Sequence, residues 1–118
     1  MSPIPELLLR QIDRWCSQCV PQHARSEMRV ETKRRGRSVT VVERRAPWDS
    51  ESAQGWSERR VAQLRYGQDG RWELFSLDRS SKWRTVSDAP DASSPVPLLE
   101  EIDRDPHGLF WGSPSNGG

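Results

Sequence analysis

The two cysteines of this 118-residue chain have a spacing that could support chemistry. Cys16 and Cys19 stand three residues apart, as in a redox dithiol, and with His23 and His107 they could supply four zinc ligands. A reactive thiol is favoured at the start of a helix, where the helix dipole stabilises the thiolate, but this pair falls at the end of an expected helix. We therefore interpret both cysteines as core residues and predict no metal and no cofactor.

A carboxylate and a lysine alternate along an expected strand, at Glu31 and Lys33. Metal-dependent nucleases use this triplet spacing to place both groups at one metal-bound phosphate. Such a site needs a further strand-borne acid upstream, and the only Asp before the triplet, Asp13, lies on an expected helix. The chain also contains no local Ser-His-acid signature and no glycine loop that leads into a helix. We therefore expect a protein without catalytic residues.

Basic residues concentrate around the first expected hairpin. Residues 25 to 45 contain eight basic residues against three acids, whereas residues 88 to 105 contain six acids against one arginine. Arginines beside exposed aromatic rings can neutralise phosphates and stack on bases. The hypothesis is a non-catalytic module that binds nucleic acid or an acidic protein, and the candidate residues are Arg34, Arg35, Arg37, Arg44, Arg45 and Trp48. The competing interpretation is a solvated hairpin whose charges block edge pairing.

A second candidate site is built on Glu43, which alternates with Val39 and Val41. If those valines face the core, Glu43 points inward and needs an arginine partner, for which we consider Arg65. If Val42 faces the core instead, Glu43 is exposed. The alternative function is therefore a small enzyme or ligand-binding domain with a pocket near Glu43, Arg65 and His107.

The composition limits the class of protein. The net charge is +1, which argues against a strongly basic polyanion binder, and the mean hydropathy is −0.87. Only 33% of residues are apolar, but six tryptophans can bury a large area each. No stretch approaches a membrane span of about 20 apolar residues, and the opening segment has no signal-peptide pattern. We expect a cytoplasmic protein that does not contact membranes.

Periodicity predicts an α+β fold. Apolar residues at three- and four-residue spacing indicate a helix over residues 5–19, and a shorter one over 95–103. Alternation and turn signals predict five strands, over residues 28–33, 39–45, 61–66, 71–77 and 82–86. Short turns between strands give an antiparallel meander, and both helices are expected to cover one face of it.

The chain is expected to form one domain over residues 1–112, followed by a disordered polar tail over 113–118. Residues 46–57 are expected to be a long loop. The closing motif, Asp105 to Gly112, reads "DPHGLFWG" and ends in large apolar residues. We expect this segment to fold back and seal the sheet, so that it acts as a latch. The alternative is that Trp111 and Trp48 wall a ligand pocket.

Four motifs together resemble a known small family. They are "VPQHAR", "SVTVVERRAPW", "VAQLRYGQDGRWELFSLDRSSKWR" and "LLEEIDRDPHGLFWG". Over residues 7–112 the chain is similar to the bacterial family known as domain of unknown function 3024. The resemblance implies a bacterial, intracellular, single-domain protein, and it assigns no activity, cofactor or site residue.

Overall fold

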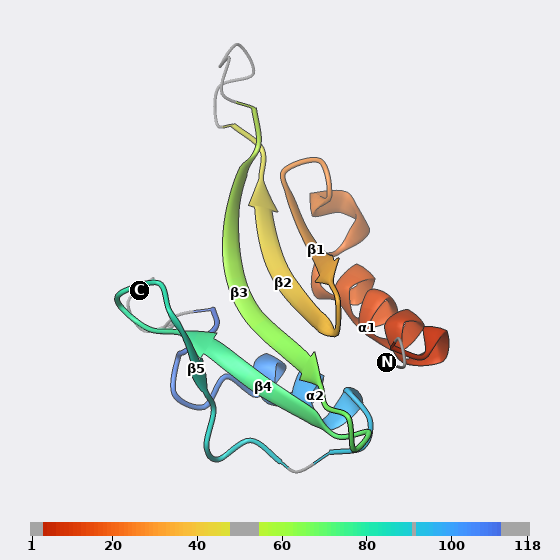
Figure 1. The fold of residues 1–118 in the computed structure, drawn as a ribbon. Helices are drawn as coiled ribbons and strands as arrows, with labels where there is room; N and C mark the ends of the chain where they lie inside the picture. Colours follow the sequence, from red (N-terminus) through yellow and green to blue (C-terminus); the bar gives the residue numbers. More distant parts are fainter. Residues whose placement is uncertain (1–3, 48–54, 91, 112–118) are drawn as a thin grey trace.

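The computed structural model describes residues 4–47, 55–90 and 92–111 (Figure 1). An N-terminal helix is followed by a five-stranded antiparallel sheet and a short C-terminal helix, which confirms the predicted α+β architecture. The elements are α1 (Glu6–Cys19), a 3-10 turn (Gln22–Ala24), β1 (Met28–Arg35), β2 (Ser38–Arg45), β3 (Ser57–Tyr66), β4 (Trp72–Leu77), β5 (Trp83–Thr85) and α2 (Val96–Arg104).

The sheet is a simple meander in the order β1-β2-β3-β4-β5. A two-residue turn joins β1 to β2, and its first residue, Gly36, has a φ of 58°, a conformation that favours glycine. Across this hairpin Val30 lies opposite Glu43 and Glu31 lies opposite Val42. Since side chains alternate between faces, Glu43 and Val42 point to opposite sides of the sheet.

The pairing of β2 with β3 contains a bulge. Val41 lies opposite Ala62, but the next residue, Val42, lies opposite Arg60, so that Val61 is the extra residue. Beyond the bulge Glu43 faces Arg59 across the strands, and Arg44 faces Glu58. The bulge therefore decides which of the two neighbouring arginines of β3 shares a face with Glu43.

A single hydrophobic cluster contains residues of both helices and of the sheet. It includes Ile12 and Cys16 from α1, Leu98 and Ile102 from α2, and Val41 from β2. In Figure 1, α1 lies beside β1 and α2 lies behind β4. Val42 is only 1% exposed yet does not belong to this cluster, which agrees with its place on the opposite face.

Two boundaries differ from the sequence-based expectation by more than one residue. β3 begins at Ser57 and not at Val61, so that the strand gains four charged or polar residues and the expected loop over 46–57 loses only its last residue. β1 likewise continues to Arg35, beyond its last apolar residue. Trp48 and the polar tail over 113–118 lie outside the described residues.

The closing motif is held in place by Asp105. This residue ends α2 with a left-handed φ of 42°, and its carboxylate accepts hydrogen bonds from the Phe110 and Trp111 backbone N–H groups at 3.0 and 2.9 Å. Phe110 is 1% exposed and lies in the core cluster, whereas Leu109 faces solvent. Gly108, with a φ of 68°, allows the chain to reverse between Asp105 and Phe110. The motif folds back onto the domain, as a latch would.

Candidate binding surfaces

The arginines of the first hairpin do not form one surface. Arg34 and Arg35 at its tip are exposed, and within the described part of the chain neither takes part in an ion pair. Arg37 is tied down: its Nη2 donates to the Gly67 carbonyl at 2.9 Å, and its guanidinium lies 5.1 Å from the centre of the Tyr66 ring. Only the two tip arginines therefore remain available as predicted.

Arg44 and Arg45 are neighbours in sequence but serve opposite faces. Arg44 pairs with Glu31 at 3.2 Å and with Glu58 at 4.0 Å. Arg45 pairs with Glu43 at 2.9 Å. The predicted basic surface is thus divided, because alternation along β2 sends consecutive side chains to different sides of the sheet.

The side of the sheet opposite the core cluster carries arginine–aromatic pairs, and we call it the arginine face. The guanidinium of Arg29 lies 4.9 Å from the centre of the Trp56 ring, and that of Arg60 lies 5.7 Å from the Trp83 ring. A third pair joins Arg65 to Phe75 at 3.9 Å. Such stacking is favourable because the face of an aromatic ring attracts a cation.

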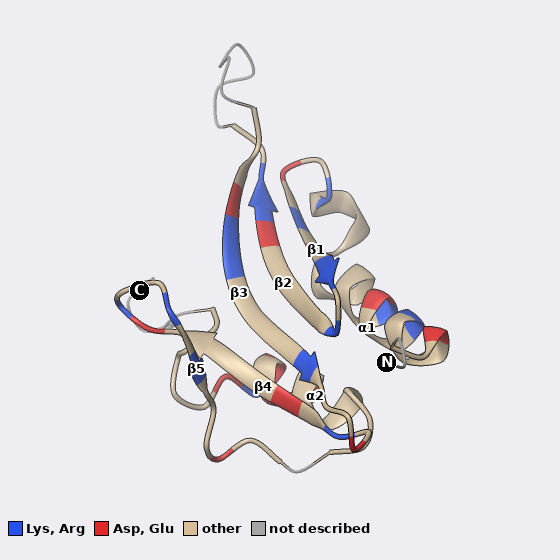
Figure 2. Ribbon diagram, viewed as in Figure 1, with Lys and Arg blue, Asp and Glu red and all other residues tan. Residues whose placement is uncertain are grey.

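The arginine face has an excess of positive charge. By the strand register it carries Arg29, Lys33, Arg35, Arg44, Arg60 and Arg65 together with Glu31, Glu58 and Glu73. Figure 2 shows acidic and basic residues next to one another where β2 ends and β3 begins. Lys33 is neutralised there by Glu58 at 2.7 Å. Arg60 has no acidic partner among the described residues, so that its charge is available to a ligand.

Glu43 lies on the other face, at the end of the sheet nearest the latch. Its side chain is 7% exposed. Its carboxylate accepts a 2.9 Å hydrogen bond from Arg45 Nε and forms an ion pair with Arg59 Nη2 at 3.6 Å. Arg59 Nη1 also donates to the Phe110 carbonyl at 3.0 Å, which links the strand to the latch. Of the two orientations considered for Glu43, the structure has the inward one.

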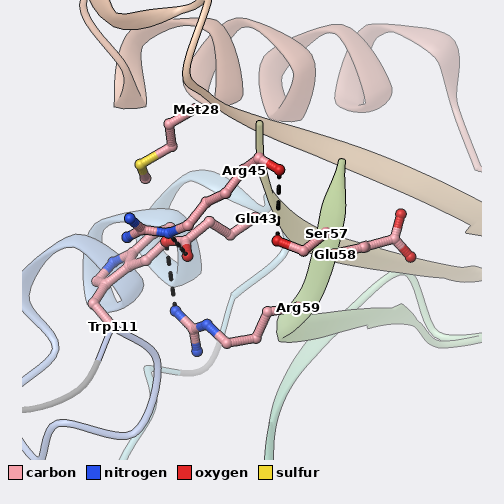
Figure 3. Close-up of a pocket in the computed structure, with 7 residues that line it drawn as sticks. All are labelled: Met28, Glu43, Arg45, Ser57, Glu58, Arg59 and Trp111. Carbon is pink, nitrogen blue, oxygen red and sulfur yellow. Dashed lines mark hydrogen bonds and ion pairs between the residues drawn. The ribbon is translucent and has the colours of Figure 1, made fainter. Parts of the chain in front are cut away.

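A hollow of about 690 Å³ opens beside this ion pair (Figure 3). It is lined by Met28, Glu43, Arg45, Ser57, Glu58, Arg59 and Trp111. Figure 3 shows the guanidinium groups of Arg45 and Arg59 on either side of the Glu43 carboxylate, with Glu58 pointing away from them. We call this hollow the Glu43 pocket. It combines charged groups with the apolar side chains of Met28 and Trp111.

The prediction that Arg65 is the partner of Glu43 was wrong. Arg65 lies opposite Ser38, six positions along β3 from the residue opposite Glu43, a separation of about 20 Å at strand spacing. Arg65 Nε instead donates to the Gln63 side chain at 2.6 Å. The expectation failed because Arg65 has the opposite orientation and belongs to the arginine face.

His107 is also separate from Glu43 and is exposed. Its Nε2 lies 2.6 Å from an Asp88 carboxylate oxygen. The hydrogen bond to Asp88, reinforced by the carboxylate charge, raises the pKa of His107, and the same hydrogen bond lowers the pKa of Asp88. The histidine fixes the polar segment ahead of α2 to the latch and does not line the Glu43 pocket.

The fold favours the protonated thiol form of both cysteines. Burial, with a smaller effect from neighbouring acidic groups, raises the pKa values of Cys16 and Cys19 to about 12, so that little thiolate exists near neutral pH. Both thiols are free. Within residues 4–47, 55–90 and 92–111, no group of three or more His, Cys, Asp or Glu side chains could hold a metal, and no helix there is long and apolar enough to cross a membrane.

Sequence reasoning missed Arg59, and it did not pair Trp56 or Trp83 with a particular arginine. One signal pointed toward Arg59 without reaching it: the second strand was expected to be seven residues long, and a hairpin partner of equal length that ends at Tyr66 begins at Arg60. The stacking partners had no such signal, because they depend on the register of non-adjacent strands.

Comparison with known proteins gives a family and no further relative. A family model described as "Domain of unknown function (DUF3024)" matches residues 1–112, which confirms the resemblance seen in the four motifs. No curated protein and no solved structure matches the chain.

Proposed function

The chain belongs to the DUF3024 family, whose function is unknown, and from its own geometry we propose that it is a non-catalytic module that binds single-stranded nucleic acid on the arginine face. The observation that carries this proposal is the set of three arginine–aromatic pairs on that face. Single strands bind by stacking bases on aromatic rings and arginine planes while basic side chains neutralise phosphates.

The arrangement of these pairs supports a strand of nucleic acid more than a duplex. Trp56 and Trp83 are partly exposed, and they flank β3 at the edges of the face. Between them, Val42 and Phe75 are nearly covered, so that the centre of the face is closed and its rim is open. Unstacked bases can reach rings at such a rim, whereas paired bases keep their faces inside the duplex.

Charge is the second support for this proposal. Arg60 and Arg65 carry positive charge without an acidic partner in the described residues, and Arg35 at the hairpin tip extends the same face. An acidic protein would also meet this charge, but it would make no use of the stacked rings. We therefore favour a nucleic acid over an acidic protein as the partner.

The experiment is a titration of tryptophan fluorescence with single-stranded DNA and RNA, duplex DNA and an acidic peptide, at low and near-physiological salt. We expect saturable quenching by the single strands that weakens steeply with salt. Arg60→Gln and Arg65→Gln should each weaken binding and lower the salt slope by about one, as expected for a lost phosphate contact.

Arg59→Gln is the matched control, because Arg59 adjoins Arg60 but contacts Glu43 on the other face. Its affinity for single strands should stay within a factor of about two. Absence of binding at low salt would refute the proposal. Equal losses for Arg59→Gln and Arg60→Gln would also refute it, and binding of the acidic peptide alone would identify the face as a protein contact.

A further inference from the structure

The Glu43 pocket offers an unused pair of hydrogen-bond donors. Arg45 Nε donates to the Glu43 carboxylate, and within the described residues neither of the Arg45 Nη groups donates a hydrogen bond. The Nε edge of the Arg45 guanidinium is fixed by the buried Glu43 carboxylate, and its two Nη groups remain free to donate. Two adjacent guanidinium donors match the two oxygens of a carboxylate or phosphate group.

The charge inside the pocket is positive by one. Arg45 and Arg59 meet one buried carboxylate, that of Glu43. Glu58 also lines the hollow, but its carboxylate is engaged by Lys33 at 2.7 Å and by Arg44 at 4.0 Å on the arginine face. A monoanion is therefore the ligand that completes the local charge balance.

The walls of the pocket suit an apolar body. Trp111 and Met28 are the large apolar side chains among its lining residues. The indole of Trp111 is held in place, because its Nε1 donates to the Ile102 carbonyl at 3.1 Å and its backbone N–H donates to Asp105. A rigid aromatic wall binds a flat ligand without losing side-chain freedom on association.

We propose that the Glu43 pocket binds a small organic monoanion, whose carboxylate or phosphodiester head meets Arg45 and whose aromatic or aliphatic body lies against Trp111 and Met28. Glu43 acts as the positioning residue that aims Arg45, and Arg59 ties the site to the latch through the Phe110 carbonyl. The volume of about 690 Å³ falls within the range of small-molecule sites. This site is independent of the arginine face.

The test is an NMR titration of the full chain with phenylacetate, the monoanionic diester methyl phenyl phosphate and the neutral analogue phenylacetamide. The indole N–H signal of Trp111, assigned with Trp111→Phe, and the Arg45 Nε–H signal report binding. We expect saturable shifts with one or both anions, and the stronger of the two identifies the head group. The amide should bind at least about tenfold more weakly, because it carries no charge for Arg45 to pair with.

Arg45→Gln should weaken anion binding at least about tenfold, whereas Arg44→Gln should change it by less than about twofold because Arg44 faces the other side. If Arg45→Gln does not fold, Arg45→Lys keeps the charge and removes the fork, and it should weaken binding several-fold. No saturable shift with either anion would overturn the proposal. Equal binding of the amide, or equal losses for Arg44→Gln and Arg45→Gln, would overturn it as well.

Discussion

The arginine face and the Glu43 pocket use the same amino acid in two different ways. Arg60 on the arginine face stacks on Trp83 at 5.7 Å and has no acidic partner in the described residues. Arg59, its neighbour in the chain, is anchored to buried Glu43 at 3.6 Å and to the Phe110 carbonyl at 3.0 Å. Arg59 is therefore committed to the fold through both contacts, whereas Arg60, which rests on a ring, keeps its charge available for a partner.

The difference comes from what lies beneath each surface. The Glu43 pocket is built on the core cluster and the latch, and Glu43, Arg59 and Trp111 each have two partners there. The arginine face covers only a thin apolar layer, Val42 and Phe75, with long charged side chains. Rigid surroundings favour a small shaped ligand, and mobile charged side chains favour a polymer that can adapt to them.

The largest expected effect distinguishes the two apolar layers. Phe110→Ala should lower the free energy of unfolding by about 3–5 kcal/mol, the usual range for a buried phenylalanine in a core. Phe75→Ala should cost clearly less, because the Arg65 side chain can relax over the gap and water can enter it. Urea denaturation of both variants measures the difference. Equal losses would mean that the arginine face covers a second core.

A smaller effect compares the two carboxylates that pair with arginines on opposite faces. Glu43→Gln should destabilise the protein by about 1–2 kcal/mol, since Arg45 and Arg59 lose a buried charged acceptor but are themselves half exposed. Glu31→Gln should change the stability by about 0–1 kcal/mol, because its pair with Arg44 is solvated. Thermal and urea unfolding provide the measurement. A larger loss for Glu31→Gln would reverse the assignment of the buried site.

The smallest effect concerns the exposed pair of His107 and Asp88. Because the pKa of His107 is raised in the folded state, its contribution to stability is present below the ordinary histidine pKa and is lost as the pH rises through the folded value. Because the pKa of Asp88 is lowered, the contribution of the carboxylate is lost only as the pH falls through its lowered value. The pair therefore stabilises the fold most at pH values between the lowered pKa of Asp88 and the raised pKa of His107.

An NMR titration of the His107 ring protons tests this prediction. The pKa of His107 should lie above 6.5 in the native protein and return toward 6.5 in Asp88→Asn. Asp78→Asn is the control, because Asp78 pairs with Arg84 and should leave His107 unchanged. A pKa that does not respond to Asp88→Asn would show that the contact is absent in solution.

The α+β order of elements could be predicted because each strand with an apolar face alternates, and the turns after β1 and β3 contain glycine. The first four residues of β3 could not be predicted from periodicity, since Ser57, Glu58, Arg59 and Arg60 are all exposed and carry no apolar repeat. They are held as a strand by pairing with β2 rather than by burial of their own side chains.

The candidate site was predictable only in part. Inward placement of Glu43 followed from its alternation with Val39 and Val41, and it was one of two orientations that the residues allowed. The identity of its partners was not predictable, because Arg59 reaches Glu43 only through the bulge at Val61. The hairpin arginines appeared as one basic patch in sequence, but strand alternation separates Arg44 from Arg45.

The bulge at Val61 determines on which face of the sheet each of the preceding side chains of β3 lies. If Val61 paired regularly with Val42, Arg60 would come opposite Glu43 and Arg59 would come opposite Arg44, so that each arginine would exchange its face. One apolar residue thereby determines which face of the sheet Glu58, Arg59 and Arg60 occupy. Deletion of Val61 would remove the bulge and leave Arg59 and Arg60 on the faces that they occupy, whereas straightening the bulge with Val61 retained would exchange the two surfaces without altering an arginine.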